Sequence, residues 1–353
     1  MNVTIHAGMH KTGSSSIQST LFNFKSADFA YLPWKIPNHS NLFALLFYEP
    51  VEEYFQFKAK GLCRQTLLAM RRENLSKLAD YLVLHNNDHI IMSAEIISGV
   101  RYGQATEDLK RFLNHYTDDI RVVAYVRPPI SFMQSNLQQL LKGNYSKFDY
   151  LSLWPNYKER FDKIDRIFGR ANVTLRAYSK NTLYNGDVVA DFCRLICISV
   201  PQQQFLRSND SLSLEALSLL YVYRKMSGEP PFSGKTASLI ENNLFIRALS
   251  SVGSRKYSFS RRIINEVIDK YGSDLLWMEK RLGCSLLERP SSEFDIDSEA
   301  DLFQVASELE DDLDALCSDC LSGVHPKHQA AIRLKLAKLK VYVNRLRKPQ
   351  AAQ

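Results

Sequence analysis

The amino-terminal stretch Val3-Thr4-Ile5-His6-Ala7-Gly8-Met9-His10-Lys11-Thr12-Gly13-Ser14-Ser15-Ser16 decides the fold expected for this chain. A short β-rich run leads into a loop with two glycines, and Ser14 to Phe24 then have helical spacing. Such a turn directs several backbone N–H groups at one point, where the helix dipole adds positive charge. With Lys11 and the serine hydroxyls, the stretch predicts an anion site. The alternative is an ordinary turn with a serine cap.

The loop does not match the Walker A motif, which requires a glycine, four residues and then Gly-Lys-Ser/Thr. Here Lys11 precedes Gly13 instead of following it. The spacing therefore disfavours an ATPase or a GTPase. A P-loop-type nucleotide kinase or NTPase is kept as the alternative enzyme class.

Further buried strands are expected along the first half of the chain, separated by helical stretches. The candidates are Phe29–Leu32, His89–Met92, Ile120–Val126 and Val173–Tyr178. This alternation predicts an α/β fold with a central parallel sheet between helical layers. From Ser211 onward the pattern is almost wholly helical. We expect an α/β core over 1–225, a helical C-terminal cap of the same domain over 226–326, and a basic helix or tail over 327–353.

A second candidate anion contact follows the strand Ile120–Val126. Arg127 stands at the carboxyl end of this strand, where open α/β sheets bind their ligands, and its planar guanidinium suits a phosphate. Ser135 lies about two helical turns further on if a helix begins near Pro129. Either residue alone is also compatible with an ordinary surface position.

Together the two segments resemble the sulfotransferase family that uses 3′-phosphoadenosine-5′-phosphosulfate (PAPS). Lys11-Thr12-Gly13-Ser14-Ser15 looks like the family's 5′-phosphosulfate loop, and Arg127 with Ser135 eight positions later looks like its 3′-phosphate motif. Thr174–Tyr178 resembles the strand whose terminal tyrosine lies near adenine, and the segments 191–193 and 209–213 resemble recurrent bacterial stretches. The resemblance covers about residues 1 to 225 and is looser beyond them.

The resemblance implies a P-loop-like sulfotransferase fold and sulfuryl transfer from PAPS to an acceptor hydroxyl or amine, without a metal. The acceptor it implies is a glycan or glycolipid. Lys11 would stabilise the charge on the leaving oxygen. The residues expected to bind PAPS are His10, Lys11, Thr12, Gly13, Ser14, Ser15, Ser16, Arg127, Ser135, Tyr178, and, as a partial match to a late Arg-Lys-Gly loop, Arg255 and Lys256.

The acceptor must also lose a proton, which requires a general base. Glu95 is the first candidate because it follows the strand Ile90–Ser93 at the edge of the sheet that carries the loop. His10 and His39 are the alternatives. Glu95 can equally be a helix-start acid satisfied by the helix dipole.

The formal net charge of +7 is concentrated in one segment. Lys327 to Lys348 contains eight basic residues and no acid, so the rest of the chain is nearly neutral. This segment predicts a helix that lies on an anionic membrane, packs on the main domain or is solvated. No nucleic-acid motif is present, and a non-catalytic nucleotide-binding scaffold with this tail as its contact surface is the non-enzyme alternative.

The six cysteines are sparse and widely spread, which favours a reducing compartment over a disulfide framework. Cys317 and Cys320 with His325 and His328 are too closely spaced for a zinc finger. No signal segment or spanning apolar run is recognisable. We expect a cytoplasmic protein, peripheral at most to the inner face of a membrane.

Overall fold

The structure is a computed structural model that describes residues 1–86, 88–207, 211–228, 236–288, 294–319 and 324–347. It divides into two compact units. The first contains Met1–Pro129, Pro155–Asn209 and Tyr271–Leu287, and the second contains Ile130–Trp154, Asp210–Lys270 and Glu288–Gln353. The segment 209–213, which resembles a recurrent bacterial stretch, lies partly outside the described residues, because 209 and 210 are not among them.

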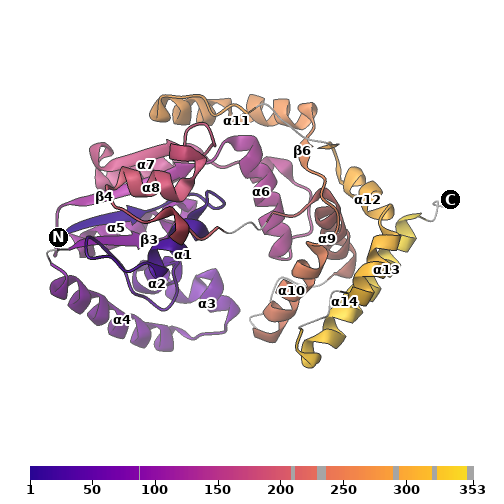
Figure 1. Cartoon of the computed structure of the whole chain (residues 1–353), viewed down its shortest axis with the longest axis horizontal. Coiled ribbons are helices and arrows are strands. Elements are labelled where there is room, and N and C mark those ends of the chain that lie inside the picture. Colours follow the sequence, from indigo (N-terminus) through magenta and orange to yellow (C-terminus); the bar gives the residue numbers. More distant parts are fainter. Residues whose placement is uncertain (87, 208–210, 229–235, 289–293, 320–323, 348–353) are drawn as a thin grey trace. The chain divides into compact units, whose positions relative to one another are not determined.

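The first unit is built on a five-stranded parallel sheet with the order β2-β3-β1-β4-β5. Figure 1 labels β3 and β4 of this sheet among the helices that surround it. The predicted α/β class and central parallel sheet are therefore confirmed, and every predicted strand is present. The strands are β1 (Asn2–His6), β2 (Ala30–Tyr31), β3 (His89–Ser93), β4 (Ile120–Val126) and β5 (Val173–Ala177).

Helices flank this sheet and bury its apolar side chains. Helices α1 (Ser14–Asn23) and α8 (Val188–Leu195) pack together over a cluster that includes Ile91, Val123 and Tyr125 of the strands. Helix α7 (Tyr157–Phe168) contacts β4 and β5, and α5 (Gly103–Leu113) packs on α7. The remaining helices of the unit are α2 (Ser40–Phe47), α3 (Phe55–Ala59) and α4 (Arg64–Leu84).

Short 3-10 helices complete the connections of both units. They span Val51–Glu53, Glu95–Ser98, Val100–Tyr102, Tyr150–Leu153, Arg170–Asn172, Tyr184–Gly186 and Gln202–Gln204. The turn Glu95–Ser98 directly follows β3 at the carboxyl edge of the sheet, and Ser98 donates a hydrogen bond from Oγ to the Gly8 carbonyl. This contact ties the turn after β3 to the loop after β1.

The second unit is mostly helical and surrounds α9 (Leu214–Ser227), whose residues from Leu214 to Arg224 are all buried. Helices α12 (Glu299–Ser307) and α14 (Pro326–Arg347) pack on α9. The unit also has α6 (Pro129–Lys142), α10 (Thr236–Leu249), the first part of α11 (Arg261–Leu282), α13 (Glu310–Asp319), and a parallel pair, β6 (Tyr257–Phe259) with β7 (Phe294–Ile296).

The two compact units do not coincide with the predicted segments 1–225, 226–326 and 327–353. Residues 130–154 and 210–225 belong to the second unit instead of the α/β core, and residues 271–287 belong to the first. Helical periodicity reports which face of a helix is buried but not which partner covers it. The strand pair Tyr257–Phe259 with Phe294–Ile296 also lies where the sequence indicated helices.

The basic C-terminal segment is helical, as expected, and it packs on its unit. Its buried residues are His328, Ile332, Leu336, Leu339 and Val343. These positions recur every three or four residues, so one face of α14 meets α9 and its neighbours. Among the described residues, no helix combines the length and the apolar character needed to cross a membrane.

Candidate functional site

The loop after β1 lies at the point where the chain changes direction in the sheet. From β1 the chain continues to β2 and β3 on one side, and from β4 it continues to β5 on the other. The carboxyl ends of two adjacent strands that diverge in this way form the crevice where open α/β sheets bind ligands. Lys11 follows β1 and Arg127 follows β4, so both predicted anchors stand at this edge of the sheet.

The loop presents a row of unused backbone donors. In the described part of the chain, the amides of residues 11–15 donate no hydrogen bond, whereas those of Ser16 and Ile17 donate to the Gly13 carbonyl. Lys11 and Gly13 have positive φ values of 62° and 74°, and the Thr12 hydroxyl donates to the Met9 carbonyl at 2.7 Å. Amides at the start of a helix form an anion site, so the predicted geometry of residues 11–15 is present.

Arg127 binds this loop directly. Its Nη1 donates to the Lys11 carbonyl oxygen at 2.6 Å, and the Tyr157 hydroxyl donates to the carbonyl of Arg127 at 2.6 Å. Positive φ is unfavourable for lysine, so this contact helps to hold the backbone of Lys11 in its strained conformation. The two cationic segments that the sequence singled out separately are therefore in contact.

Tyr178 completes the same edge of the sheet. It follows β5, and its backbone N–H donates to the Val126 carbonyl at 2.8 Å. Its hydroxyl lies 3.4 Å from the position that a Cβ on Gly13 would occupy. Burial raises the pKa of Tyr178 while the charge of Arg127 opposes that rise, which reflects their proximity.

A buried histidine that the sequence analysis did not select lies beneath the loop. His6 is fully buried, and its Nδ1 is 2.8 Å from the Ser93 hydroxyl, which accepts a hydrogen bond from Gln18 Nε2 at 3.0 Å. Its Nε2 has no partner within the described residues. A Cβ on Gly8 would lie 2.9 Å from His6 Nε2, 3.0 Å from Thr12 Oγ1 and 3.3 Å from Ser14 Oγ.

These contacts define the protonation of His6. Burial lowers the pKa of His6 to about 4, although the charge of Glu95 raises it slightly, so the ring is neutral at pH 7. Because Gln18 donates to Ser93 Oγ, the Ser93 hydroxyl can donate to Nδ1, and the ring proton then sits on Nε2. In this tautomer Nε2 offers a donor toward the loop. The position of His6 in a β-rich run was the sequence signal for burial. Nothing in the sequence revealed that one of its ring nitrogens would lack a partner.

Replacing Gly8 with alanine should destabilise the protein by about 1–3 kcal/mol, because the added methyl group overlaps the confined His6 ring and the Thr12 hydroxyl. Urea unfolding measures the change. Gly272→Ala is the matched control, since a Cβ at Gly272 meets no atom within 4 Å, and it should be neutral or stabilising. Equal stability of the two variants would contradict the close packing around Gly8.

Glu95 and His10 form a pair beside the loop. His10 Nδ1 is 3.6 Å from Glu95 Oε2, and Asn38 Nδ2 donates to the same oxygen at 3.1 Å. Burial raises the pKa of Glu95, but the interactions with His10 and Ser14 together lower it by more, so the net shift is downward. Glu95 is therefore an ionised, hydrogen-bonded carboxylate. The His10 side chain is 60% exposed, against 14% for Glu95, so the histidine is the accessible member of the pair.

His39 has a different environment from the one expected of a general base. It is buried, its Nδ1 accepts a hydrogen bond from the Ser93 amide at 3.1 Å, and its Nε2 is 3.1 Å from the Leu32 carbonyl. Both ring nitrogens are thus engaged by the backbone. Burial lowers the pKa of His39 to about 4. The arrangement supports a structural role, in which His39 joins the segment after β2 to the end of β3.

Stability should fall as the pH drops from 7 to 5. His6 and His39 titrate near pH 4 when folded but near 6.5 when unfolded, so the unfolded state binds more protons in that window. Each histidine should then lower the free energy of unfolding by roughly 2 kcal/mol at pH 5 relative to pH 7. Urea unfolding at several pH values measures this slope. It should be shallower in His39→Gln, and an unchanged slope in that variant would refute the assignment.

The other predicted contacts belong to the second unit. Ser135 lies on α6 and is partly exposed, and Lys256 is exposed. Arg255 donates to the buried carboxylate of Glu215 at 2.6 Å. That ion pair gives Arg255 a structural partner of its own. The first unit therefore supplies the loop residues, Arg127, Tyr178, Glu95 and His10, and the second unit holds Ser135, Arg255 and Lys256.

No group of three or more potential metal ligands occurs among the residues that the structure describes. His328 Nδ1 is 3.3 Å from Glu241 Oε1. Cys320 lies outside the described residues, so the structure gives no distance between Cys317 and Cys320.

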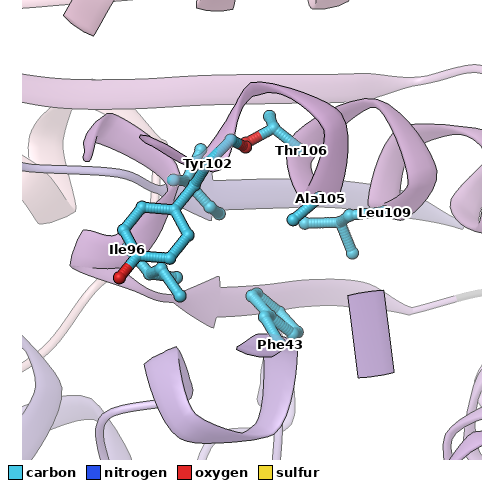
Figure 2. A pocket seen from close by; sticks show the side chains of 7 residues that line it. Phe43, Ile96, Tyr102, Ala105, Thr106 and Leu109 are labelled. Carbon is cyan, nitrogen blue, oxygen red and sulfur yellow. The ribbon is translucent and has the colours of Figure 1, made fainter. Parts of the chain in front are cut away.

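A small pocket in the first unit is apolar and distinct from the loop. It lies between α2, the turn after β3 and α5, and Figure 2 shows Phe43, Ile96, Tyr102 and Leu109 converging on it. Its lining contains no acid and no base. Because the lining has no charged side chain, the candidate site is the loop edge of the sheet, where Lys11 and Arg127 lie.

Comparison with known proteins adds little to this geometry. No family model matches the chain, and no solved structure matches it. An uncharacterised protein from Archaeoglobus fulgidus is 24% identical over 144 residues, which cover 38% of this chain and 37% of that protein. The match spans little more than a third of that relative. The fold and the candidate site define an α/β protein with a loop of unused backbone N–H groups at the switch point of its parallel sheet.

Proposed function

We propose that this protein transfers a sulfuryl group from PAPS to an acceptor hydroxyl or amine. The observation that carries the proposal is the hydrogen bond from Arg127 to the Lys11 carbonyl. It supports a single site in which the lysine loop and the arginine face one ligand with an anionic group at each end. A nucleotide with phosphosulfate at its 5′ end and phosphate at its 3′ end has this charge distribution.

The residues present fit the 5′ group. The amides of residues 11–15 are unused donors in the described chain, and Lys11 adds a full positive charge. His6 Nε2 adds a buried donor directed at the same loop, with the Thr12 and Ser14 hydroxyls nearby. Donors of this kind stabilise an anion without a metal. Tyr178, next to Gly13, is suited to lie along the adenosine.

In the proposed reaction the bond between sulfur and the bridging phosphate oxygen breaks, and a bond from sulfur to the acceptor oxygen or nitrogen forms. Lys11 neutralises the charge that develops on the bridging oxygen, which stays with the nucleotide. The loop amides hold the 5′-phosphate in line for the displacement. Arg127 holds the 3′-phosphate.

His10 is the better candidate for the base that takes the acceptor's proton. Glu95 is a weak base because hydrogen bonds stabilise its ionised form. If Glu95 accepts the proton of His10 Nδ1, then His10 Nε2 presents its lone pair toward the exposed side. We therefore propose that His10 Nε2 accepts the proton and that Glu95 positions the ring. The acceptor proposed is a glycan or glycolipid.

Replacing His10 with glutamine should lower kcat by roughly 10²- to 10⁴-fold, because the proton would lose its acceptor. Glu95→Gln should lower kcat less, since the histidine would remain but lose its orientation. The exposed residue His115 provides the matched control, His115→Gln, which should keep full activity. A larger loss in Glu95→Gln than in His10→Gln would reverse the two roles.

Calorimetry with 3′-phosphoadenosine-5′-phosphate (PAP) and with ADP tests the nucleotide. The proposal expects PAP to bind without magnesium and at least about tenfold more tightly than ADP, because only PAP places a phosphate on Arg127. Magnesium-dependent binding of ADP with no preference for PAP would favour a nucleotide kinase. Failure to bind PAP even at millimolar concentration would overturn the proposal.

Labelled-sulfate transfer from PAPS to cell-surface glycans and glycolipids tests turnover. Transfer that His10→Gln abolishes is the expected result. Binding of PAP without transfer to any acceptor, and unchanged PAP affinity in His10→Gln, would instead describe a nucleotide-binding scaffold.

A further inference from the structure

The outward face of helix α14 has a composition that its packing does not require. Its buried face carries Ile332, Leu336, Leu339 and Val343, spaced by four, three and four residues. On the opposite side, Lys327, Ala330, Leu334, Ala337, Lys338, Val341 and Arg345 are all exposed. We call these seven residues the outer face of α14. Apart from the adjacent Ala337 and Lys338, they recur every three or four residues, which places them on one face of the helix.

The middle of the outer face is apolar. Leu334 is 58% exposed and Val341 is 49% exposed. The two residues are seven positions apart in the sequence, and Ala337 lies between them. Single exposed apolar side chains are common on protein surfaces. Here they are aligned along the solvent side of a helix whose other side already supplies the core contacts.

Basic side chains border this apolar line, and they have no acidic partners. Lys327, Lys338 and Arg345 lie on the outer face, and Arg333 lies beside it. None of these four cations makes an ion pair within the residues that the structure describes. The helix itself has no acid between Pro326 and Arg347. The acidic side chains that contact α14 meet residues outside this set of four: Glu241 lies 3.3 Å from His328, and Glu310 pairs with Arg347.

We propose that the outer face of α14 binds the surface of an anionic lipid bilayer. Phosphate and carboxylate headgroups complement the unpaired cations, while Leu334 and Val341 reach the boundary between headgroups and acyl chains. A nucleic acid would use the cations but would gain nothing from the apolar line. This proposal depends only on α14 and its unit, so it stands or falls separately from sulfuryl transfer.

Vesicle sedimentation of the full-length protein tests this surface. The protein should sediment with phosphatidylcholine vesicles that contain about one third phosphatidylserine, and should remain in solution with phosphatidylcholine alone. High salt should release it because exposed charges are screened. Absence of sedimentation with the phosphatidylserine vesicles at low salt would overturn the proposal.

Two sets of variants separate a specific face from general charge attraction. Arg333→Gln, Lys338→Gln and Arg345→Gln combined should weaken partitioning roughly a hundredfold. The matched control combines Lys158→Gln, Arg166→Gln and Arg170→Gln, which remove the same charge from exposed positions of the first unit and should change partitioning little. Equal losses in the two triple variants would contradict a role for α14.

The apolar contribution has its own test. Leu334→Ser with Val341→Ser should weaken partitioning several-fold while leaving the melting temperature unchanged, because both side chains are exposed. An unchanged affinity for phosphatidylserine vesicles in this variant would show that Leu334 and Val341 do not contribute to membrane binding. Binding of a DNA duplex that matches or exceeds vesicle binding would identify the wrong partner and overturn it.

Discussion

Replacing Lys11 with methionine should reduce sulfuryl transfer by roughly 10²- to 10³-fold, because a group that stabilises developing charge contributes this much. Methionine keeps most of the length of the side chain but removes its charge. The loop amides remain, so PAP should still bind, although more weakly. Single-turnover transfer from PAPS, measured beside calorimetry with PAP, separates the loss in the chemical step from the loss in binding.

The backbone of Lys11 offers an unusual control. Its φ of 62° suits glycine better than any side chain, so Lys11→Gly should not lower the melting temperature. The same variant should lose transfer as severely as Lys11→Met. If Lys11→Gly retained activity, the lysine charge would have no part in the reaction, and the loop would act through its amides alone.

Replacing Arg127 with alanine should weaken PAP binding by about 10- to 100-fold, which corresponds to the loss of hydrogen bonds to a charged group. ADP, which lacks the 3′-phosphate, should lose much less affinity. Some loss for ADP is expected, since Arg127 also donates to the Lys11 carbonyl and holds the loop. The diagnostic quantity is therefore the ratio of the PAP and ADP dissociation constants.

Arg127→Lys refines this measurement. Lysine keeps the charge but lacks the planar fork that bonds a phosphate and a carbonyl at the same time. An intermediate PAP-to-ADP ratio is expected. If PAP and ADP lost affinity equally in both variants, Arg127 would serve only to hold the Lys11 backbone, and the 3′-phosphate would have to bind elsewhere.

Much of the fold could be predicted from the sequence because the signals are local. Each strand of the sheet is a short apolar run between helical stretches, and that alternation allows few arrangements other than a parallel sheet. The loop from Gly8 to Gly13 was recognisable because glycines, a lysine and serines between a strand and a helix have a direct physical meaning. Arg127 was recognisable from its place at the end of a strand.

The proposed catalytic pair, Glu95 and His10, shows where local sequence signals stop. Glu95 and His10 lie far apart in the sequence, and only the pairing of β1 with β3 brings their loops together. The sequence favoured Glu95 as the base, but the hydrogen bond that it accepts from Asn38 and its contact with His10 depend on tertiary structure. These contacts shift the proposed role toward His10.

By itself, the sequence determined the strands, the parallel sheet and the loop between the first strand and the first helix, since these follow from side-chain period and backbone freedom. It also provided the candidate residues for the proposed anion site. Only the tertiary structure decided that Arg127 donates a hydrogen bond to the Lys11 carbonyl. It also decided that His6 Nε2 has no hydrogen-bond partner among the described residues and that the His39 side chain is buried. It also decided which helices join which unit. The reason is that such properties depend on distances between residues remote in sequence, and these distances are set by packing of the whole unit.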